Sequence, residues 1–572
     1  MQVKLVNENF KADYVDNLLL SRGIKNLENF KNPTYDDIEN WGKLSNIERA
    51  VAIFREIVDV KEKINVGTII DCDADGLTSA SILINYLKKN FPQIIITGYF
   101  HEHKQHGLED VWEAMIEKDY DLVIIADASS NDGQFIKEFN CPVIVLDHHE
   151  LEPDSEIPPN MTLINNQTSP AYENKALSGA GIAWQFCRAL DDHYRFTDAD
   201  NYLDLCAVGV CGDVMDGREI ENQAIWKLGF SNIKNYGLQK FIEAQSYSMG
   251  GKINPTTIAF YIVPLINATI RVGSMPEKTR LFQTFVNGHE LVPSNKRGEK
   301  GLMTEVVNEA IREATNNRSK QNKILDSAMD SLEIKISKYD LLEHKILFVR
   351  LEDEVFPSEL NGLLAMRLSQ KYQRPTIVAR LNDEGYDRGS ARGLSNCELA
   401  DFKSYLEQTS LFEYTAGHSN ACGCSLPDKN LTQLMKIADT DLASSDFSNN
   451  VYEVNFERPA VAHDLNSLIT EIAQNEAIWS TNNKEPLIYI TDLNFNVHDI
   501  QIMGTRKDTL KIEKNGIAFM KFHATDLINE IQELGELKMN LVGRANLNSW
   551  MGRITPQIFI ENYELKDGEL EF

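Results

Sequence analysis

The sequence predicts an α/β protein of several domains, the first of which is a doubly wound parallel sheet. Three observations favour this architecture. From residue 66 onward, short β-branched runs alternate with helical patterns, an alternation typical of parallel sheets. Several of these runs end in acidic residues, at the strand ends where open α/β sheets bind their ligands. The length of 572 residues corresponds to three or four domains at roughly 100–200 residues each.

The elements of the first half follow from periodicity. Helices are predicted over 14–20 and 46–60, separated by a turn at Asn32-Pro33. After the first strand, apolar residues recur with helical spacing at Ala80, Leu83, Ile84 and Leu87. A helix rich in small residues is predicted over 204–211, ending at Gly212-Asp213. The strands of the sheet are predicted at 66–70, 94–100, 121–126 and 143–146.

The second half contains a polar helical stretch followed by two further domains. Residues 296–335 are polar and carry two helical stripes of apolar residues, which indicates a surface helix. Strands over 345–349 and 376–381 predict a second α/β domain, and 444–450 has the composition of a linker. The remaining stretch predicts a β-rich domain with strands over 487–490, 517–522 and 558–560.

Composition narrows the class of protein. The apolar share of 42% is that of a globular protein, and eight scattered cysteines without a Cys-x-x-Cys pair favour a reducing cytoplasm. We expect no membrane span and no signal peptide. With 57 basic and 85 acidic residues, the net charge of −28 opposes nucleic-acid binding unless bound cations and a few arginines meet the phosphates.

Acidic residues end three of the predicted strands. The stretch Asp71-Cys-Asp73-Ala-Asp75-Gly76 follows the first, Asp127 follows the third, and Asp147-His148-His149 ends the fourth. Taken alone, the first stretch fits a solvated turn as well as a metal site. Because the carboxyl ends of parallel strands meet at one edge, these groups and Asp213 together predict a site for Mn²⁺ or Mg²⁺ rather than a cysteine-built zinc site.

Further segments carry a family resemblance. The acids above resemble the motifs of the DHH phosphoesterase superfamily, and the rest of the chain resembles its RecJ-type single-strand DNA exonucleases. The segments that carry the second resemblance begin at Leu19, Leu177, Pro264, Asn361, Arg374, Gly389, Gly417 and Arg544. The resemblance implies a DHH domain over 61–290 after an N-terminal helical segment (1–60), a connecting helix (291–335), a DHH-associated domain (336–448) and a C-terminal β-barrel of the oligonucleotide/oligosaccharide-binding (OB) type (449–572).

The resemblance also implies a two-ion phosphodiesterase site. Asp75 and Asp127 would face both ions, His149 would donate to the scissile phosphate, and Asp147 would orient the histidines. The implied metal ligands are Asp71, Asp73, Asp75, Asp127, His148 and Asp213, and the implied catalytic residues are His149, Asp147 and Asp127. Two cations would generate the nucleophile and stabilise charge on the phosphoryl group.

Substrate contacts are expected from seven side chains. Ser390 and Arg392 resemble a loop that holds a 5′-terminal phosphate. The complete set is His101, Asn267, Arg271, Ser390, Arg392, His418 and Trp550. Alternatives remain open for three of them: a surface ion pair for Arg271, a structural histidine for His418 and a core position for Trp550.

The segment around His101 departs from the family pattern. His101 stands where RecJ enzymes usually carry an arginine, which weakens the expectation of strict 5′-phosphate recognition. His101, His103 and Lys104 are candidates to replace that arginine, and the histidines of 101–106 are also candidates for an accessory metal site.

The function implied is metal-dependent hydrolysis of single-stranded DNA from the 5′ end, releasing mononucleotides in DNA repair, recombination or replication. We expect a cytoplasmic monomer that binds single-stranded DNA, with a single-strand-binding protein or a helicase as candidate partners. Two alternatives are kept. One is a phosphodiesterase for short oligonucleotides (nanoRNA) or cyclic dinucleotides, whose chains are usually shorter and lack the C-terminal domain. The other is a non-catalytic DNA-binding replication scaffold, which the intact acids disfavour.

Overall fold

The computed structural model describes most of the chain and divides it into two compact units. The described residues are 1–101, 106–352, 356–394, 399, 401–445, 447, 451–533, 536–550 and 553–567. One unit, here named the catalytic unit after the expected catalytic residues that it contains (Asp127, Asp147 and His149), comprises Glu28–Lys323 with Ala477–Asn483. The other, here the terminal unit, comprises Met1–Leu27, Ile324–Glu476 and Lys484–Phe572.

The catalytic unit is built on the predicted parallel sheet, which is confirmed. Its order is β3-β2-β4-β5-β6, and every neighbouring pair runs parallel. The strands are β2 (Ile64–Ile70), β3 (Ile94–Phe100), β4 (Leu122–Ala126), β5 (Val143–Asp147) and β6 (Met161–Asn165), the last not anticipated from the sequence. Since β3 lies on one side of β2 and β4 on the other, the chain changes direction across the sheet between β2 and β4.

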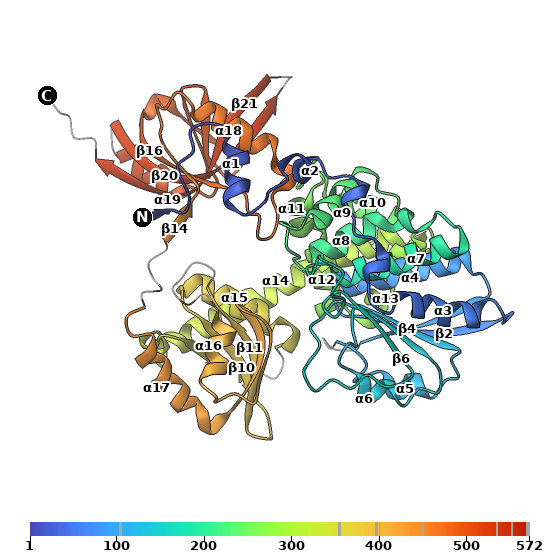
Figure 1. Ribbon diagram of the computed structural model, residues 1–572. Helices are drawn as coiled ribbons and strands as arrows, with labels where there is room; N and C mark the ends of the chain where they lie inside the picture. Colours follow the sequence, from blue (N-terminus) through green and yellow to red (C-terminus); the bar gives the residue numbers. More distant parts are fainter. Residues whose placement is uncertain are drawn as a thin grey trace. The chain divides into compact units, whose positions relative to one another are not determined.

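Both faces of this sheet are buried, which explains why its strands are continuously apolar. Along β4 and β5, Ile124 and Leu146 join one core while Ile125 and Val145 join another. Figure 1 shows α4, α7 and α8 on one side of the sheet and α5 and α6 on the other. The helices that flank the sheet are α3 (Ile47–Val58), α4 (Ala74–Asn90), α5 (Trp112–Ile116), α6 (Gly133–Ile136), α7 (Gly179–Tyr194) and α8 (Leu203–Gly212).

Further helices complete the catalytic unit. They are α9 (Ile220–Ser231), α10 (Tyr236–Gln245), α11 (Pro255–Thr257), α12 (Val263–Val272) and α13 (Met275–Asn287). Among the described residues one stretch, Pro255–Val272, is long and apolar enough to cross a membrane, although the sequence analysis expected none. Half of it is buried within the protein, which is also typical of a core helix.

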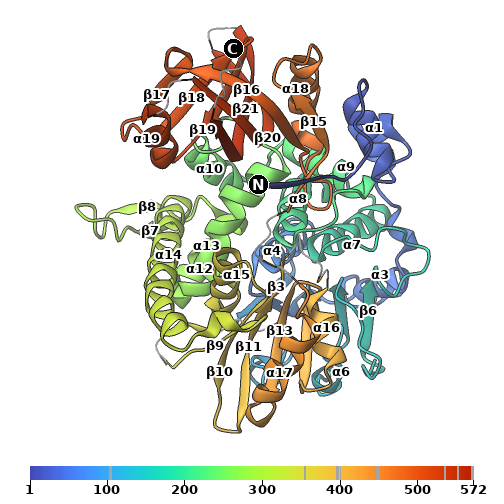
Figure 2. The same cartoon turned by 90° about the vertical axis from the view of Figure 1, so that its left-hand side faces the viewer.

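The connector is a 33-residue helix, α14 (Val306–Lys338), shared by the two units. Residues 291–305, assigned to the connecting helix from sequence, instead contain a hairpin of β7 (Leu291–Pro293) and β8 (Met303–Glu305), which leads into α14 (Figure 2). Arg280 of α13 donates two hydrogen bonds to Glu313 of α14, at 2.9 and 2.7 Å, and fixes the first half of the helix on the catalytic unit.

The terminal unit contains a mixed five-stranded sheet in the order β12-β13-β11-β10-β9. Only β9 and β10 run parallel. The strands are β9 (Leu347–Arg350), β10 (Thr376–Leu381), β11 (Tyr386–Arg392), β12 (Tyr414–His418) and β13 (Ala421–Pro427). The helices of this region are α15 (Asn361–Tyr372), α16 (Phe402–Gln408) and α17 (Leu431–Asp441).

The C-terminal region forms a seven-stranded sheet in the order β15-β16-β20-β21-β19-β18-β17. Its longest strands, β20 (Glu536–Trp550) and β21 (Arg553–Asp567), pair antiparallel. The others are β15 (Phe456–Pro459), β16 (Leu487–Asn496), β17 (Ile500–Met503), β18 (Thr509–Lys514) and β19 (Ile517–Lys521), with helices α18 (Leu465–Gln474) and α19 (Thr525–Glu533).

The N-terminus packs on this C-terminal region, which the sequence did not reveal. A strand, β1 (Gln2–Leu5), precedes the predicted helix α1 (Tyr14–Ser21) and pairs parallel with β14 (Val451–Val454). The buried guanidinium of Arg458 donates to Asp464, which also accepts from the Tyr14 hydroxyl. The first residues therefore belong structurally to the end of the chain, whereas α2 (Leu27–Lys31) leads into the catalytic unit.

Candidate metal centre

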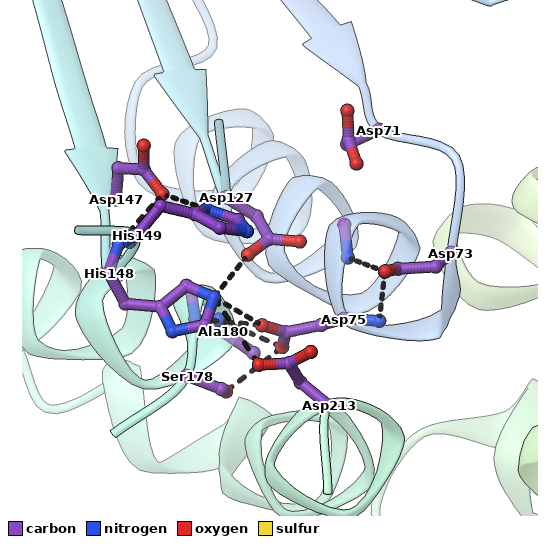
Figure 3. Close-up of polar contacts among 12 residues, drawn as sticks. Asp71, Asp73, Asp75, Asp127, Asp147, His148, His149, Ser178, Ala180 and Asp213 are labelled. Atoms are coloured by element: carbon purple, nitrogen blue, oxygen red, sulfur yellow. Dashed lines mark hydrogen bonds and ion pairs between the residues drawn. The ribbon is translucent and has the colours of Figure 1, made fainter. Parts of the chain in front are cut away.

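The predicted acids converge at the point where the strand order reverses. Asp71, Asp73 and Asp75 follow β2, and Asp127 follows the neighbouring strand β4. Figure 3 shows these side chains facing one another together with those at the end of β5 and Asp213 at the end of α8. The crevice at such a switch point is where doubly wound sheets bind ligands.

Asp75 is held by the start of α7. Its carboxylate accepts hydrogen bonds from the Ser178 hydroxyl at 2.9 Å, the Gly179 amide at 2.8 Å and the Ala180 amide at 3.1 Å. A helix N-terminus favours an anion, so α7 orients this buried side chain and offsets part of the cost of its charge. The approach of α8 needs Gly209, because a Cβ there would lie 2.3 Å from Asp75 Oδ1.

Asp127 occupies a strained turn directly after β4. Its φ of 67° is in the left-handed region, which Asp and Asn tolerate better than most residues. Only glycine fits opposite it, since a Cβ at Gly179 would lie 2.2 Å from Asp127 Oδ1. That buried oxygen accepts no well-aligned hydrogen bond from the described residues, and its charged neighbour is His148.

His148 faces three carboxylates at once. Its Nε2 lies 3.2 Å from Asp127 Oδ1, 3.5 Å from Asp213 Oδ2 and 3.9 Å from Asp75 Oδ2. The ligand atoms of Asp75, His148 and Asp213 all lie within 4.8 Å of one another, as do those of Asp71, Asp73 and Asp127. Asp127 therefore lies beside both groups, which is the position expected of a carboxylate that faces two ions.

Asp147 positions the two histidines from behind. One oxygen, Oδ1, accepts from the His148 amide at 2.7 Å and pairs with His149 Nδ1 at 2.8 Å, while Oδ2 accepts from the Ser130 amide at 2.8 Å. Burial alone would raise the pKa of Asp147, but the hydrogen bond and charge of His149 hold it well below its usual range. Burial likewise opposes the charged form of His149, yet Asp147 raises its pKa to about 9.

The acids that face His148 are poorly suited to being charged together. Burial, followed by repulsion from neighbouring acids, raises the pKa of Asp75 to about 6 and that of Asp213 to about 8. The same two causes raise the pKa of Asp127 well above its usual range. Carboxylate oxygens and one imidazole are a donor set that Mn²⁺ or Mg²⁺ accepts, and a divalent cation would relieve the repulsion.

These shifts predict a pH-dependent effect of metal on stability. A carboxyl group with a raised pKa in the fold stabilises it below the unfolded value, near 3.8, and this contribution is lost as the pH rises through about 6 for Asp75 and about 8 for Asp213. A cation would replace the displaced protons. We expect Mn²⁺ to raise the melting temperature of chelator-treated protein more at about pH 8.5 than at about pH 5. An equal rise at both pH values would contradict this account of the site.

Asp71 and Asp73 are not equivalent. Asp73 is the N-cap of α4, where its Oδ1 accepts from the amides of Asp75 and Gly76 at 2.9 and 3.0 Å. Asp71 is buried, and its Oδ2 pairs with His106 Nδ1 at 2.6 Å. Both still offer an oxygen beside Asp127, so the structure keeps them as candidate ligands.

Comparison with known proteins shows the family to which this chain belongs. A family model described as the DHH family N-terminal domain matches residues 64–210, and one described as the RecJ OB domain matches 461–562. A Bacillus subtilis relative that carries the provisional name SPbeta prophage-derived single-strand DNA-specific exonuclease YorK is 34% identical, over 99% of this chain and 98% of its own. This chain belongs to the RecJ-type family of the DHH superfamily.

More distant relatives agree with this assignment. The single-stranded-DNA-specific exonuclease RecJ of B. subtilis is 24% identical, over 97% of this chain and 68% of that protein. The crystal structure of RecJ in complex with Mn²⁺ from Thermus thermophilus superposes with a TM-score of 0.71 at 19% identity, covering 95% of this chain and 74% of that one. The predicted RecJ-type architecture, with its parallel-sheet domain and OB domain, is confirmed.

The predicted substrate residues of this RecJ-family chain fall in different places. Asn267 and Arg271 lie on α12 of the catalytic unit, and Asn267 Oδ1 is buried without a hydrogen bond from any described group. His101 differs from expectation, because its side chain is fully buried and pairs with Asp110 at 2.6 Å. Its imidazole therefore presents no surface to a substrate, while His103 and Lys104 lie outside the described residues.

The other four predicted substrate residues belong to the terminal unit. Ser390 and Arg392 lie on β11. They lie beside Gly362 in the first turn of α15, because a Cβ added at Gly362 would be 2.4 Å from Nη2 of Arg392. His418 is exposed at the end of β12, so a buried structural role does not apply to it. Trp550 ends β20, but its side chain is outside the part that the structure describes.

Two contributors to the site were missed from sequence. Ser178 donates a hydrogen bond to Asp75, 103 residues away in the chain. His106 pairs with Asp71, 35 residues away. No local pattern links such distant residues. The one available signal was that His106 lies in the histidine-rich segment after β3 and the Ser178 segment opens a glycine-rich helix.

Proposed function

We propose that this chain is a metal-dependent exonuclease for single-stranded DNA. The observation that carries the proposal is the cluster of buried acids around His148 at the switch point of the sheet. It stands in a chain that aligns end to end with a relative named for single-strand DNA-specific exonuclease activity. The acids that resemblance predicted as ligands converge in space, which supports hydrolysis over a non-catalytic scaffold.

We assign the site to two divalent cations, Mn²⁺ or Mg²⁺. Asp75, His148 and Asp213 would hold one, Asp71 and Asp73 the other, and Asp127 would face both. When bound, such ions supply a hydroxide nucleophile and stabilise the charge that develops on the phosphoryl oxygens. Solved RecJ structures of T. thermophilus contain Mn²⁺ or Mg²⁺, which supports the choice of ion.

The protein's own contribution to the reaction centres on His149. Its side chain is 47% exposed and lies beside the cluster, with Nδ1 paired to Asp147. With its pKa raised to about 9, the imidazole is protonated at neutral pH, so Nε2 can donate to a phosphate oxygen or protonate the leaving group. Asp147 fixes the ring and stabilises its charge, as the carboxylate partner of a catalytic histidine does.

The direction of digestion is part of the proposal. Ser390 and Arg392 on β11 would hold a 5′-terminal phosphate through charge-assisted hydrogen bonds. Arg271 on α12 is a separate candidate for contact with a phosphate. Digestion would then proceed 5′ to 3′ and release mononucleotides. A match to the RecJ OB domain over residues 461–562 favours a long single strand as substrate over short oligonucleotides or cyclic dinucleotides.

A single experiment tests function and direction together. Single strands with a 5′-phosphate or a 5′-hydroxyl, each labelled at one end, are digested with Mn²⁺ and followed by electrophoresis. We expect the 5′ label to be released first as a mononucleotide, and Arg392→Ala to slow the phosphorylated strand by ~10-fold or more. Release of the 3′ label first would refute digestion from the 5′ end. Activity on dinucleotides alone would refute a long single strand as the substrate, and inactivity with every divalent ion would refute the proposal that the protein is an enzyme.

A further inference from the structure

A thiol and an imidazole lie side by side next to the proposed catalytic cluster. Cys72 follows Asp71 directly, and its buried Sγ lies 4.0 Å from His106 Nε2. The other ring nitrogen of His106, Nδ1, pairs with Asp71 Oδ2 at 2.6 Å. The ligand atoms of Asp71, Cys72 and His106 all lie within 4.8 Å of one another, and the His106 side chain is 46% exposed, which leaves a path for an ion.

We propose that Cys72 and His106 form a second metal site, selective for a thiophilic divalent cation such as Zn²⁺. Zinc bonds of about 2.3 Å to sulfur and about 2.0–2.1 Å to nitrogen place tetrahedral ligands roughly 3.5 Å apart, so 4.0 Å requires only a small adjustment. A carboxylate on the far nitrogen of a metal-bound histidine is a recurrent arrangement, and Asp71 fills that position. Binding replaces the thiol proton, which is released to water.

A buried nitrogen of His101 faces the same carboxylate, Asp71. His101 Nδ1 pairs with Asp110 at 2.6 Å, whereas His101 Nε2 is buried and has no hydrogen-bond partner in the described chain. This Nε2 lies 3.5 Å from Asp71 Oδ1. When Nδ1 carries the ring proton and donates to Asp110, a lone pair faces a carboxylate oxygen, an arrangement that a bound cation satisfies.

The second site differs from the catalytic cluster in its donor chemistry. The catalytic cluster offers oxygens and one imidazole, whereas this site offers a thiolate, which Mn²⁺ and Mg²⁺ bind poorly and Zn²⁺ binds well. Asp71 connects the two, because it also offers an oxygen beside Asp73 and Asp127. The ring of His149 lies 6.3 Å from that of His106, centroid to centroid, within reach of an ion at His106. Zinc at this site would therefore engage Asp71 and His149, which the proposed nuclease reaction uses, and would inhibit the enzyme.

A spectroscopic experiment tests binding without relying on activity. The full chain, freed of metal and supplied with excess Mg²⁺ to fill the oxygen sites, is titrated with Co²⁺ while the near-ultraviolet cobalt–thiolate charge-transfer band is recorded. We expect the band to saturate at one equivalent, to disappear when Zn²⁺ is added, and to be lost in Cys72→Ser and weakened in His106→Gln. Cys141→Ser, a change at a free cysteine that is half-buried, is the control and should keep the band. Absence of the band in the wild type, or its persistence in Cys72→Ser, would overturn the proposal.

A second measurement tests the regulatory consequence, which rests on the proposed nuclease function. With Mn²⁺ fixed, we expect half-inhibition of the wild type at a Zn²⁺ concentration at least ~10-fold lower than that for Cys72→Ser, which should keep its Zn²⁺-free activity. Equal sensitivity of the two proteins would overturn the inhibitory role. A cobalt–thiolate band in a chain that degrades no DNA would refute the nuclease assignment while leaving the metal site intact.

Discussion

Replacing Asp127 with asparagine is expected to lower the rate of single-strand hydrolysis by at least ~10³-fold, or about 4 kcal/mol of transition-state stabilisation. Asp127 is the carboxylate that lies beside both groups of candidate ligands, and its buried Oδ1 lies 3.2 Å from His148 Nε2. An amide keeps the shape of the side chain but removes the charge that two cations would share. Rates are measured on labelled single strands over a range of Mn²⁺ concentrations.

Asparagine is preferable to alanine for this test. The φ of 67° at residue 127 is tolerated by Asn, whereas an alanine in this left-handed region would add backbone strain. Since burial and repulsion raise the pKa of Asp127, the neutral side chain should leave the metal-free protein as stable as the wild type or more so. The melting temperature with chelator therefore separates loss of chemistry from loss of fold.

A matched control lies at the other end of the same strand. Asp121 precedes β4, where it accepts from the Asn65 amide at 2.7 Å and pairs with Lys61. Asp121→Asn should lose a little stability and keep its activity. Near wild-type rates in Asp127→Asn, or a comparable loss in Asp121→Asn, would refute the assignment of the cluster as the catalytic site.

Replacing His149 with alanine is expected to slow hydrolysis by ~10²–10⁴-fold, the usual contribution of a general acid or base. The imidazole is half-exposed beside the acids, and Asp147 holds it in one orientation and favours its charged form. The loss should appear in kcat. His148 remains in place between the three carboxylates, so the Mn²⁺-induced rise in melting temperature should stay unchanged.

The stability measurement distinguishes two roles for this histidine. If the Mn²⁺-induced rise in melting temperature disappears in His149→Ala, the residue is a metal ligand and the assignment as proton donor is wrong. His289→Ala provides the control, because His289 is an exposed histidine of the same unit that pairs only with Glu305 and stacks on Tyr236 among its described contacts. It should retain full activity.

Much of the catalytic unit was predictable because its information is local. Strand–helix alternation predicted the parallel sheet, and acids at strand ends predicted the edge at which Asp71, Asp75, Asp127 and His148 meet. A parallel strand is buried on both faces and ends at the ligand-binding edge of the sheet. A continuous apolar run and an acidic residue at its end are therefore both visible within one short segment of sequence. The order of motifs along the chain was sufficient for the family.

What the sequence left undecided depends on contacts between distant segments. The strand β6, the pairing of β1 with β14 and the hairpin before α14 are not marked by strong local periodicity.

The same limit explains the individual roles of side chains in the site. Asp73 caps a helix, Asp75 is held by the amides of α7, and His101 turns inward to Asp110. Composition and spacing indicated the metal-binding chemistry proposed for this chain, since candidate metal ligands can be recognised one by one. Only the tertiary structure decided which atoms face each other, because burial and hydrogen bonding are set by residues distant in the chain, as at Asp71–His106 and Asp75–Ser178.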